Sequence, residues 1–213
     1  PSSVESRLAL LTNPGRNGGD LNNDGIPDAN QNAVTTLAWT TVDKFNSALD
    51  GTLNEIQPVI AVQVLQSNSG TAVDDSVQLF DVKVLAPNSP VVGGSKPTNA
   101  TWDPIQFSIE PLQSVGLVDI DPVRPGIQVR VLIDISNTQV AAGTFTRYMK
   151  YVDATAVAAG VFDLDGQAIT TPGWYDFTQR TPGGDGARFI TSGGLITGIE
   201  LILTDNGFGD NDP

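Results

Sequence analysis

Oxygen-bearing side chains recur at alternate positions near the N-terminus, in the sequence GDLNNDGIPDANQN at residues 19–32. Counted from Asp20, the side chains of Asp20, Asn22 and Asp24 stand at places 1, 3 and 5, and Gly25 stands at place 6. A calcium loop of the EF-hand type needs side-chain oxygens at places 1, 3 and 5, and a glycine at place 6 for its sharp turn. The spacing therefore predicts that this loop binds calcium.

Three further residues complete the predicted ligand set of this loop. Ile26 at place 7 would offer its backbone carbonyl, Asp28 stands at place 9, and Gln31 stands at place 12. Gln31 departs from the pattern because it offers one neutral oxygen where a bidentate carboxylate is usual, so a nearby asparagine or an acid from elsewhere would replace it. Pro27 keeps the loop extended, and the motif resembles the calcium loops of thrombospondin type 3 repeats. A surface turn without an ion is the alternative.

A second group of carboxylates stands in the sequence TDNGFGDNDP at residues 204–213, where Asp205, Asp210 and Asp212 surround two glycines. Carboxylates packed this densely repel one another unless a cation lies among them or water screens them. The glycines allow the tight turns that converging oxygens require. These three aspartates are therefore predicted as a second set of calcium ligands, and a solvated acidic segment is the alternative.

The sequence FDLDGQ at residues 162–167 places two more aspartates, Asp163 and Asp165, before a glycine. Two acids on their own are a weak signal for a metal site, because calcium takes six to eight oxygen ligands. An aspartate followed by glycine is a common hairpin turn, and this is the interpretation that we favour.

Two alternative functions depend on other residues. The aromatic sequence PGWYDFTQR at residues 172–180 holds Trp174 and Tyr175, whose rings could stack on a sugar in a carbohydrate-binding module. A strand that closes one end of the fold is the plainer interpretation of these rings. The Asp212–Pro213 bond is of the kind that calcium-triggered self-processing modules cleave. A sequence boundary explains its position more simply than a self-cleaving module does.

The composition narrows the chemistry to oxygen ligands. The chain has 213 residues, a formal net charge of −13, and neither cysteine nor histidine. Disulfides, thiol nucleophiles, cysteine-based zinc sites and histidine general bases are thereby excluded, and no catalytic residue is predicted. A chain this negative suits divalent cations and is a poor partner for nucleic acid or an anionic membrane surface. It has no run of 18 apolar residues, so no direct membrane insertion is expected.

The elements that must position these loops are mostly strands. Within GIQVRVLIDIS, apolar residues alternate with polar ones, as in a strand with one buried face. Similar runs, separated by clusters of Gly, Pro, Asn and Asp, predict an all-β fold, an antiparallel β-sandwich with long calcium-binding loops. The predicted strands lie at residues 57–67, 75–87, 105–112, 126–136, 143–152, 187–193 and 196–205.

One short helix is predicted within residues 40–56, where apolar residues recur near the 3.6-residue spacing of a helix face. The sequence shows no clear internal repeat and no low-complexity linker, so one continuous domain with an N-terminal appendage is predicted. Residues 1–32 form an N-terminal segment that carries the calcium loop, and residues 33–213 form the sandwich domain.

The order of several motifs resembles the choice-of-anchor U domain, a family of bacterial secreted β-rich domains found in surface proteins. The motifs are DGIPDANQNAVTTL, PIQFSIEPL, YMKY, PGWYDFT and IELILTDNGFGDNDP. The resemblance implies a module of the cell surface or extracellular matrix, and it implies no catalytic residue. The expected function is therefore that of an extracellular, calcium-binding structural or adhesive module. Its expected partners are calcium, other copies of itself, or glycans and other ligands of the cell surface.

Overall fold

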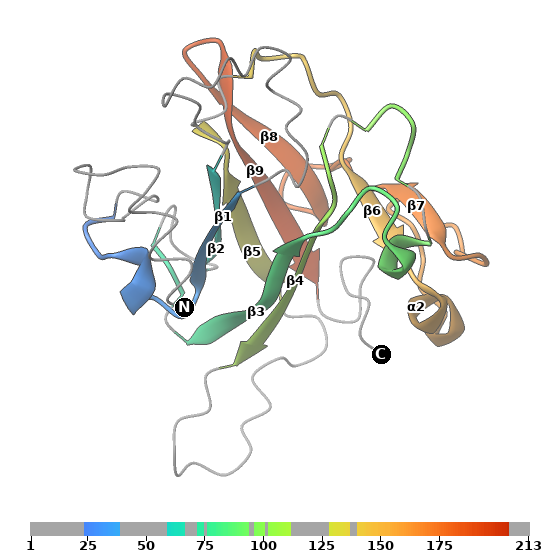
Figure 1. Ribbon diagram of the computed structural model, residues 1–213. Helices are drawn as coiled ribbons and strands as arrows, with labels where there is room; N and C mark the ends of the chain where they lie inside the picture. Colours follow the sequence, from blue (N-terminus) through green and yellow to red (C-terminus); the bar gives the residue numbers. More distant parts are fainter. Residues whose placement is uncertain are drawn as a thin grey trace, which may run out of the picture.

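The computed structural model describes residues 24–38, 59–66, 72–74, 76–93, 96–100, 102–111, 128–136 and 140–204. Its main element is a five-stranded antiparallel sheet with the strand order β1-β2-β5-β9-β8 (Figure 1). The strands are β1 (Val34–Ala38), β2 (Val59–Leu65), β5 (Gln128–Asp134), β8 (Gly186–Ser192) and β9 (Leu195–Thr204). The adjacent inner strands β5 and β9 thus come from distant parts of the chain.

A second, two-stranded antiparallel sheet packs against one face of the larger sheet (Figure 1). It consists of β3 (Val77–Val84) and β4 (Ile105–Pro111). Buried residues of the large sheet pack in one core with half-buried residues of the small one, and the core includes Ile60, Val62, Val131, Ile133, Ile199, Leu201, Leu79, Val84, Ile105 and Phe107. The all-β, sandwich-like fold predicted from the sequence is therefore confirmed.

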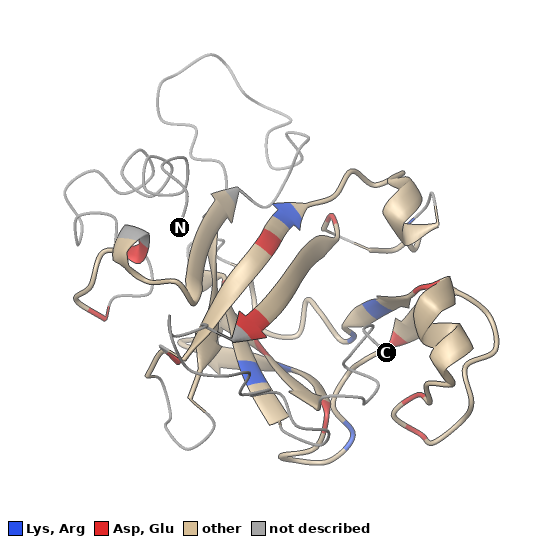
Figure 2. Cartoon of the chain, turned by 90° about the horizontal axis from the view of Figure 1, so that it is seen from below, with Lys and Arg blue, Asp and Glu red and all other residues tan. Residues whose placement is uncertain are grey.

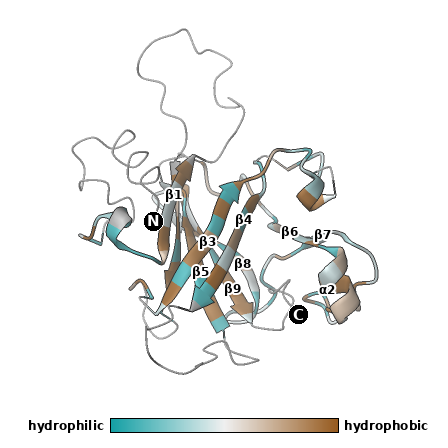
Figure 3. Ribbon diagram, turned by 60° about the horizontal axis from the view of Figure 1, so that its bottom comes forward, coloured by the Kyte–Doolittle hydropathy of each residue, from teal (hydrophilic) through white to brown (hydrophobic). Residues whose placement is uncertain are grey.

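The alternation of residue types along β5 explains how this strand faces two environments (Figure 3). Val131 and Ile133 are fully buried in the core between the sheets, whereas Gln128 is exposed. Arg130 lies on the same side of the strand as Gln128, because successive side chains of a strand point to opposite faces. The face of the large sheet that lies away from β3 and β4 therefore carries polar groups.

A third unit closes one end of the sandwich. It contains β6 (Met149–Val152), the helix α2 (Ala154–Ala159) and β7 (Gly173–Asp176), with β6 and β7 paired antiparallel. Asp153 caps α2, since its carboxylate accepts a hydrogen bond from the backbone N–H of Ala156 at 2.9 Å. Ala156 and Phe177, which follows β7, are buried in the main core, so this unit packs as part of the sandwich.

Six of the seven predicted strands are confirmed, three of them to within one residue at each boundary and the other three to within two or three residues. The prediction for residues 143–152 is wrong over its first six residues, because only Met149–Val152 forms a strand. Just before it, the backbone N–H of Tyr148 donates to the side chain of Thr178 at 2.9 Å instead of to a neighbouring strand. Strand β1 and helix α2 were not predicted as elements.

The predicted helix at residues 40–56 lies outside the described residues. Two short 3-10 turns accompany the strands, η1 (Asp28–Asn30) and η2 (Pro90–Val92). Within the described ranges, no helix has both the length and the apolar character that crossing a membrane requires.

Candidate functional site

The described part of the predicted calcium loop begins with a sharp turn at Gly25. Its φ of +91° lies in the left-handed region that favours glycine, as the sixth place of a calcium loop requires. Just before it, the Asp24 carboxylate accepts a hydrogen bond from the backbone N–H of Ile26 at 2.8 Å. The turn η1 then leads the chain toward Gln31 and the start of β1. The backbone of this segment therefore makes the turn at Gly25 that the glycine predicts.

The side chains at places 5 and 12 of the loop meet. Gln31 Nε2 donates to Asp24 Oδ2 at 2.6 Å, and the Gln31 side chain is buried although Asp24 is exposed. Calcium binds oxygen, and glutamine carries one oxygen and one nitrogen on its terminal amide. A half-turn of that amide would present Oε1 where Nε2 now stands. The two side chains lie close enough to share a cation. After this rotation, both would offer oxygen atoms to it.

Asp28, at place 9, ties the loop to the large sheet. It is 1% exposed, and its Oδ2 accepts a hydrogen bond from the hydroxyl of Thr36 on β1. One carboxylate oxygen of Asp28 is thus directed toward the sheet. Ile26, whose backbone carbonyl is the predicted ligand at place 7, has a side chain that is 48% exposed. The structure therefore brings Asp24 and Gln31 together and gives Asp28 an anchoring contact.

The remaining predicted ligands lie outside the described residues. They are Asp20 and Asn22 of the first loop and Asp205, Asp210 and Asp212 of the second group. Across the ranges that are described, no three acidic side chains converge as they would around a metal ion. Calcium ligation by the full set in either loop stays a prediction.

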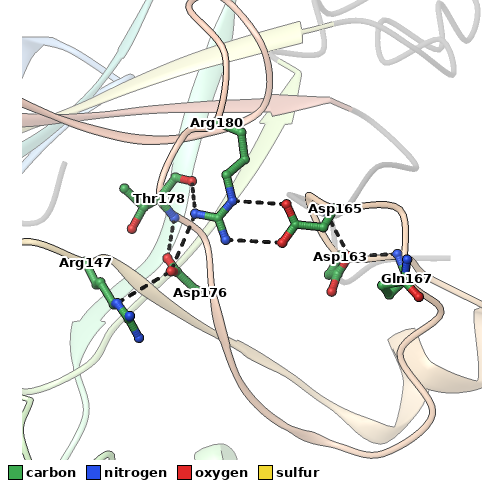
Figure 4. Close-up of polar contacts among 7 residues, drawn as sticks. All are labelled: Arg147, Asp163, Asp165, Gln167, Asp176, Thr178 and Arg180. Atoms are coloured by element: carbon green, nitrogen blue, oxygen red, sulfur yellow. Dashed lines mark hydrogen bonds and ion pairs between the residues drawn. The ribbon is translucent and has the colours of Figure 1, made fainter.

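The aspartates of FDLDGQ form a turn, as the sequence pattern indicated (Figure 4). The carboxylate of Asp163 accepts hydrogen bonds from the backbone N–H groups of Asp165 at 2.9 Å and Gln167 at 2.8 Å. Gly166 adopts a φ of +75°, and the residues on either side of the turn, Phe162 and Ala168, form an antiparallel bridge. This stretch is therefore confirmed as a hairpin-like turn.

Arginine side chains already balance the acids around this turn. Arg180 lies between Asp165, with Nε at 3.3 Å from Oδ1, and Asp176, with Nη1 at 3.5 Å from Oδ2 (Figure 4). Burial raises the pKa of Asp176, but hydrogen bonds from Thr178 and the charges of Arg180 and Arg147 outweigh it, so the net shift is downward. A guanidinium among these carboxylates repels a further cation, so the group is a poor metal site.

The aromatic group is confirmed as part of a strand. Trp174 and Tyr175 belong to β7 and are half-buried, and the Trp174 ring meets Tyr151 edge to face at 5.4 Å between centroids. The hydroxyl of Tyr175 donates to the backbone carbonyl of Thr171 at 2.7 Å. The rings are thus engaged with neighbours of the end unit, in agreement with the plainer interpretation.

One polar group was not anticipated. Glu200, on the central strand β9, is 2% exposed and lies between Arg130 of β5 and Arg188 of β8. The signal in the sequence was a single glutamate inside the apolar run IELIL, together with the arginine on the polar side of GIQVRVLIDIS. A charge in such a run requires a partner, because burying an unpaired carboxylate is costly.

Comparisons with known protein families, characterised proteins and solved structures found no match to this chain. The resemblance to the choice-of-anchor U domain therefore stays a prediction.

Proposed function

We propose that the chain is a calcium-binding structural module of a bacterial surface protein, in which calcium fixes the loop from Asp20 to Gln31. The observation that supports calcium is the contact between Asp24 and Gln31, because the residues at places 5 and 12 of a calcium loop bind the same ion and therefore lie close together. Asp205, Asp210 and Asp212 are proposed as a second set of ligands on their sequence pattern alone. An extracellular location, with a role in adhesion or display, rests on the composition and on the family resemblance.

Calcium would act here through folding free energy. The ion would neutralise carboxylates that otherwise repel one another, and it would hold a loop that has few apolar side chains of its own. Extracellular calcium sites have dissociation constants of about 10⁻⁴ to 10⁻³ M. A free calcium concentration of about ten times the dissociation constant stabilises the folded state by about 1.4 kcal/mol. For a domain of this size that corresponds to a rise in Tm of about 3–6 °C.

The test compares melting curves in calcium and in EDTA for the wild type, Asp24→Asn and Asp74→Asn. Asp74 is a matched control, because its carboxylate also accepts the backbone N–H two residues ahead, that of Ser76 at 3.0 Å, without belonging to the loop. We expect calcium to raise the Tm of the wild type and of Asp74→Asn, and to raise that of Asp24→Asn less, because asparagine keeps one oxygen ligand but loses the negative charge. An equal calcium response in all three proteins, or none in the wild type, would contradict the proposal.

A further inference from the structure

We propose that the hollow beside Glu200 is a binding site for a small carboxylate ligand, which Arg188 would hold. The hollow has a volume of about 360 Å³ and opens on the sheet face that lies away from β3 and β4. Its lining includes two arginines, one glutamate, two glutamines and one apolar side chain: Arg130, Arg188, Glu200, Gln128, Gln179 and Ile202. This site is separate from the proposed calcium loop, and it does not depend on calcium.

The strand register brings these charges together. Arg188 of β8 stands directly opposite Glu200 of β9, while Arg130 of β5 pairs with Ile202 and so reaches Glu200 diagonally. Arg130 donates from Nε at 3.2 Å, and also from Nη2, to Glu200 Oε1. Arg188 donates from Nε to Oε2, the other oxygen of the same carboxylate. Each oxygen of Glu200 is thus already engaged by its own arginine.

The two arginines together exceed the one carboxylate by one positive charge, in a chain whose formal net charge is −13. Lys and Arg occupy only a few places along the described chain (Figure 2), and the whole sequence has 11 of them against 24 Asp and Glu. Arg188 has a side chain that is 57% exposed, and among the described residues only its Nε is engaged. Its Nη1 and Nη2 groups therefore remain to bind an oxyanion. Guanidinium presents paired donors in one plane, which matches the two oxygens of a carboxylate.

The other lining groups indicate the size and the character of the ligand. A hollow of about 360 Å³ lies near the lower end of the range for small-molecule sites, so the ligand must be small. Gln179 donates from Nε2 to the backbone carbonyl of Gly184 at 2.6 Å, which leaves Oε1 as an acceptor beside the hollow. Gln128 is exposed and offers both a donor and an acceptor. Hydroxyl groups next to the carboxylate, as in an acidic sugar, would satisfy these amides.

The experiment titrates the folded chain with three probes and follows backbone amide chemical shifts by NMR. Acetate carries the carboxylate alone, glucuronate carries a carboxylate with hydroxyls, and glucose carries hydroxyls alone. The variants are Arg188→Gln, which removes the proposed contact, and Arg188→Lys, which keeps the charge but loses the paired donors. Arg147→Gln is the matched control, because Arg147 has a 73% exposed side chain and lies outside the hollow.

We expect acetate and glucuronate to shift amides of β5, β8 and β9 around Glu200, and glucose to leave them in place. Arg188→Gln should weaken carboxylate binding about tenfold or more, since a charge-assisted pair is lost, with Arg188→Lys in between and Arg147→Gln within about twofold of wild type. Tighter binding of glucuronate than of acetate would identify an acidic sugar, and equal binding a simple carboxylate. Equal weakening by Arg147→Gln, glucose binding as tight as that of glucuronate, or no shift with either carboxylate would overturn the proposal.

Discussion

The substitution Gln31→Glu separates two explanations of the N-terminal loop, because its effect on stability should change sign with calcium. Gln31 Nε2 now donates to Asp24 Oδ2 at 2.6 Å. If that hydrogen bond alone closes the loop, a glutamate at this position is destabilising under all conditions. If calcium closes it, the glutamate supplies the carboxylate that place 12 of such a loop normally carries.

The cost in the absence of calcium can be worked from the contact. Loss of a hydrogen bond to a charged group costs about 1.5–3 kcal/mol. Two carboxylates at a separation of about 4 Å repel by about 1 kcal/mol in water and about 4 kcal/mol near a protein surface. Asp24 is exposed but Gln31 is buried, so the smaller repulsion is a lower limit and the total is at least about 3 kcal/mol. At about 2–4 °C per kcal/mol, the Tm in EDTA should fall by about 6–12 °C or more.

In the presence of calcium, Gln31→Glu should become more stable than the wild type. A bidentate acid at place 12 raises the calcium affinity, and each tenfold gain adds about 1.4 kcal/mol of stabilisation once calcium is in excess. The assay is differential scanning calorimetry of the wild type and Gln31→Glu at several calcium concentrations. Gln167→Glu is the control, because it adds the same charge to the Asp163 turn, which Arg180 partly balances through Asp165. A calcium response of Gln31→Glu no larger than that of the wild type would refute the reasoning.

Three further predictions concern the sandwich itself. Gly186→Ala should lower the free energy of unfolding, measured in urea, by about 2 kcal/mol or more. Gly186 has a φ of +126°, and a Cβ there would lie 2.6 Å from the Gln179 Cα. Gly143→Ala should cost less, because Gly143 has a φ of +85° but open space around it. Burial raises the pKa of Glu200, but hydrogen bonds and charges from its two arginines outweigh burial and lower the pKa overall. The contribution of Glu200 to stability is therefore present above about pH 4.5 and should be lost as the pH falls further. Glu200→Gln should reduce the fall in Tm over this acidic range. Burial raises the pKa of Tyr148 to about 12, so the stability of the fold should fall as the pH rises from about 10 to about 12. The difference between the absorbance titrations of the wild type and Tyr148→Phe should show a tyrosine that ionises near pH 12.

The sequence predicted the strands well where one face of a strand is apolar and the other polar. β5 is the clearest case, since Val131 and Ile133 are buried while Gln128 is exposed. β1 was missed because its residues do not alternate: Val34, Thr35 and Thr36 are all buried, so no period of two is visible. Alternation also says nothing about which strands are neighbours, and the pairing of β5 with β9 had to come from the structure.

The two candidate sites also differ in how far the sequence could predict them. The spacing of the predicted calcium loop is local information, and the turn at Gly25 and the contact between Asp24 and Gln31 lie within eight residues of chain. The cluster around Glu200 joins residues 12 and 70 positions apart along the chain. Only the register of three strands creates it, so no local motif could have identified it.

The partners of the buried acids indicate where calcium would matter. Three acidic residues are buried in the described structure, and each has a donor within the protein: Asp28 has Thr36, Asp103 has Lys96 at 2.9 Å, and Glu200 has two arginines. Within the described sandwich, Asp103 and Glu200 are therefore paired with cationic side chains, whereas Asp28 belongs to the loop and has the neutral hydroxyl of Thr36 as a donor. The loop differs, because Asp24 is exposed and accepts a hydrogen bond from the neutral amide of Gln31, which an ion could displace. Calcium would thus order the loop and fix its connection to β1. The core between the sheets would stay folded without calcium.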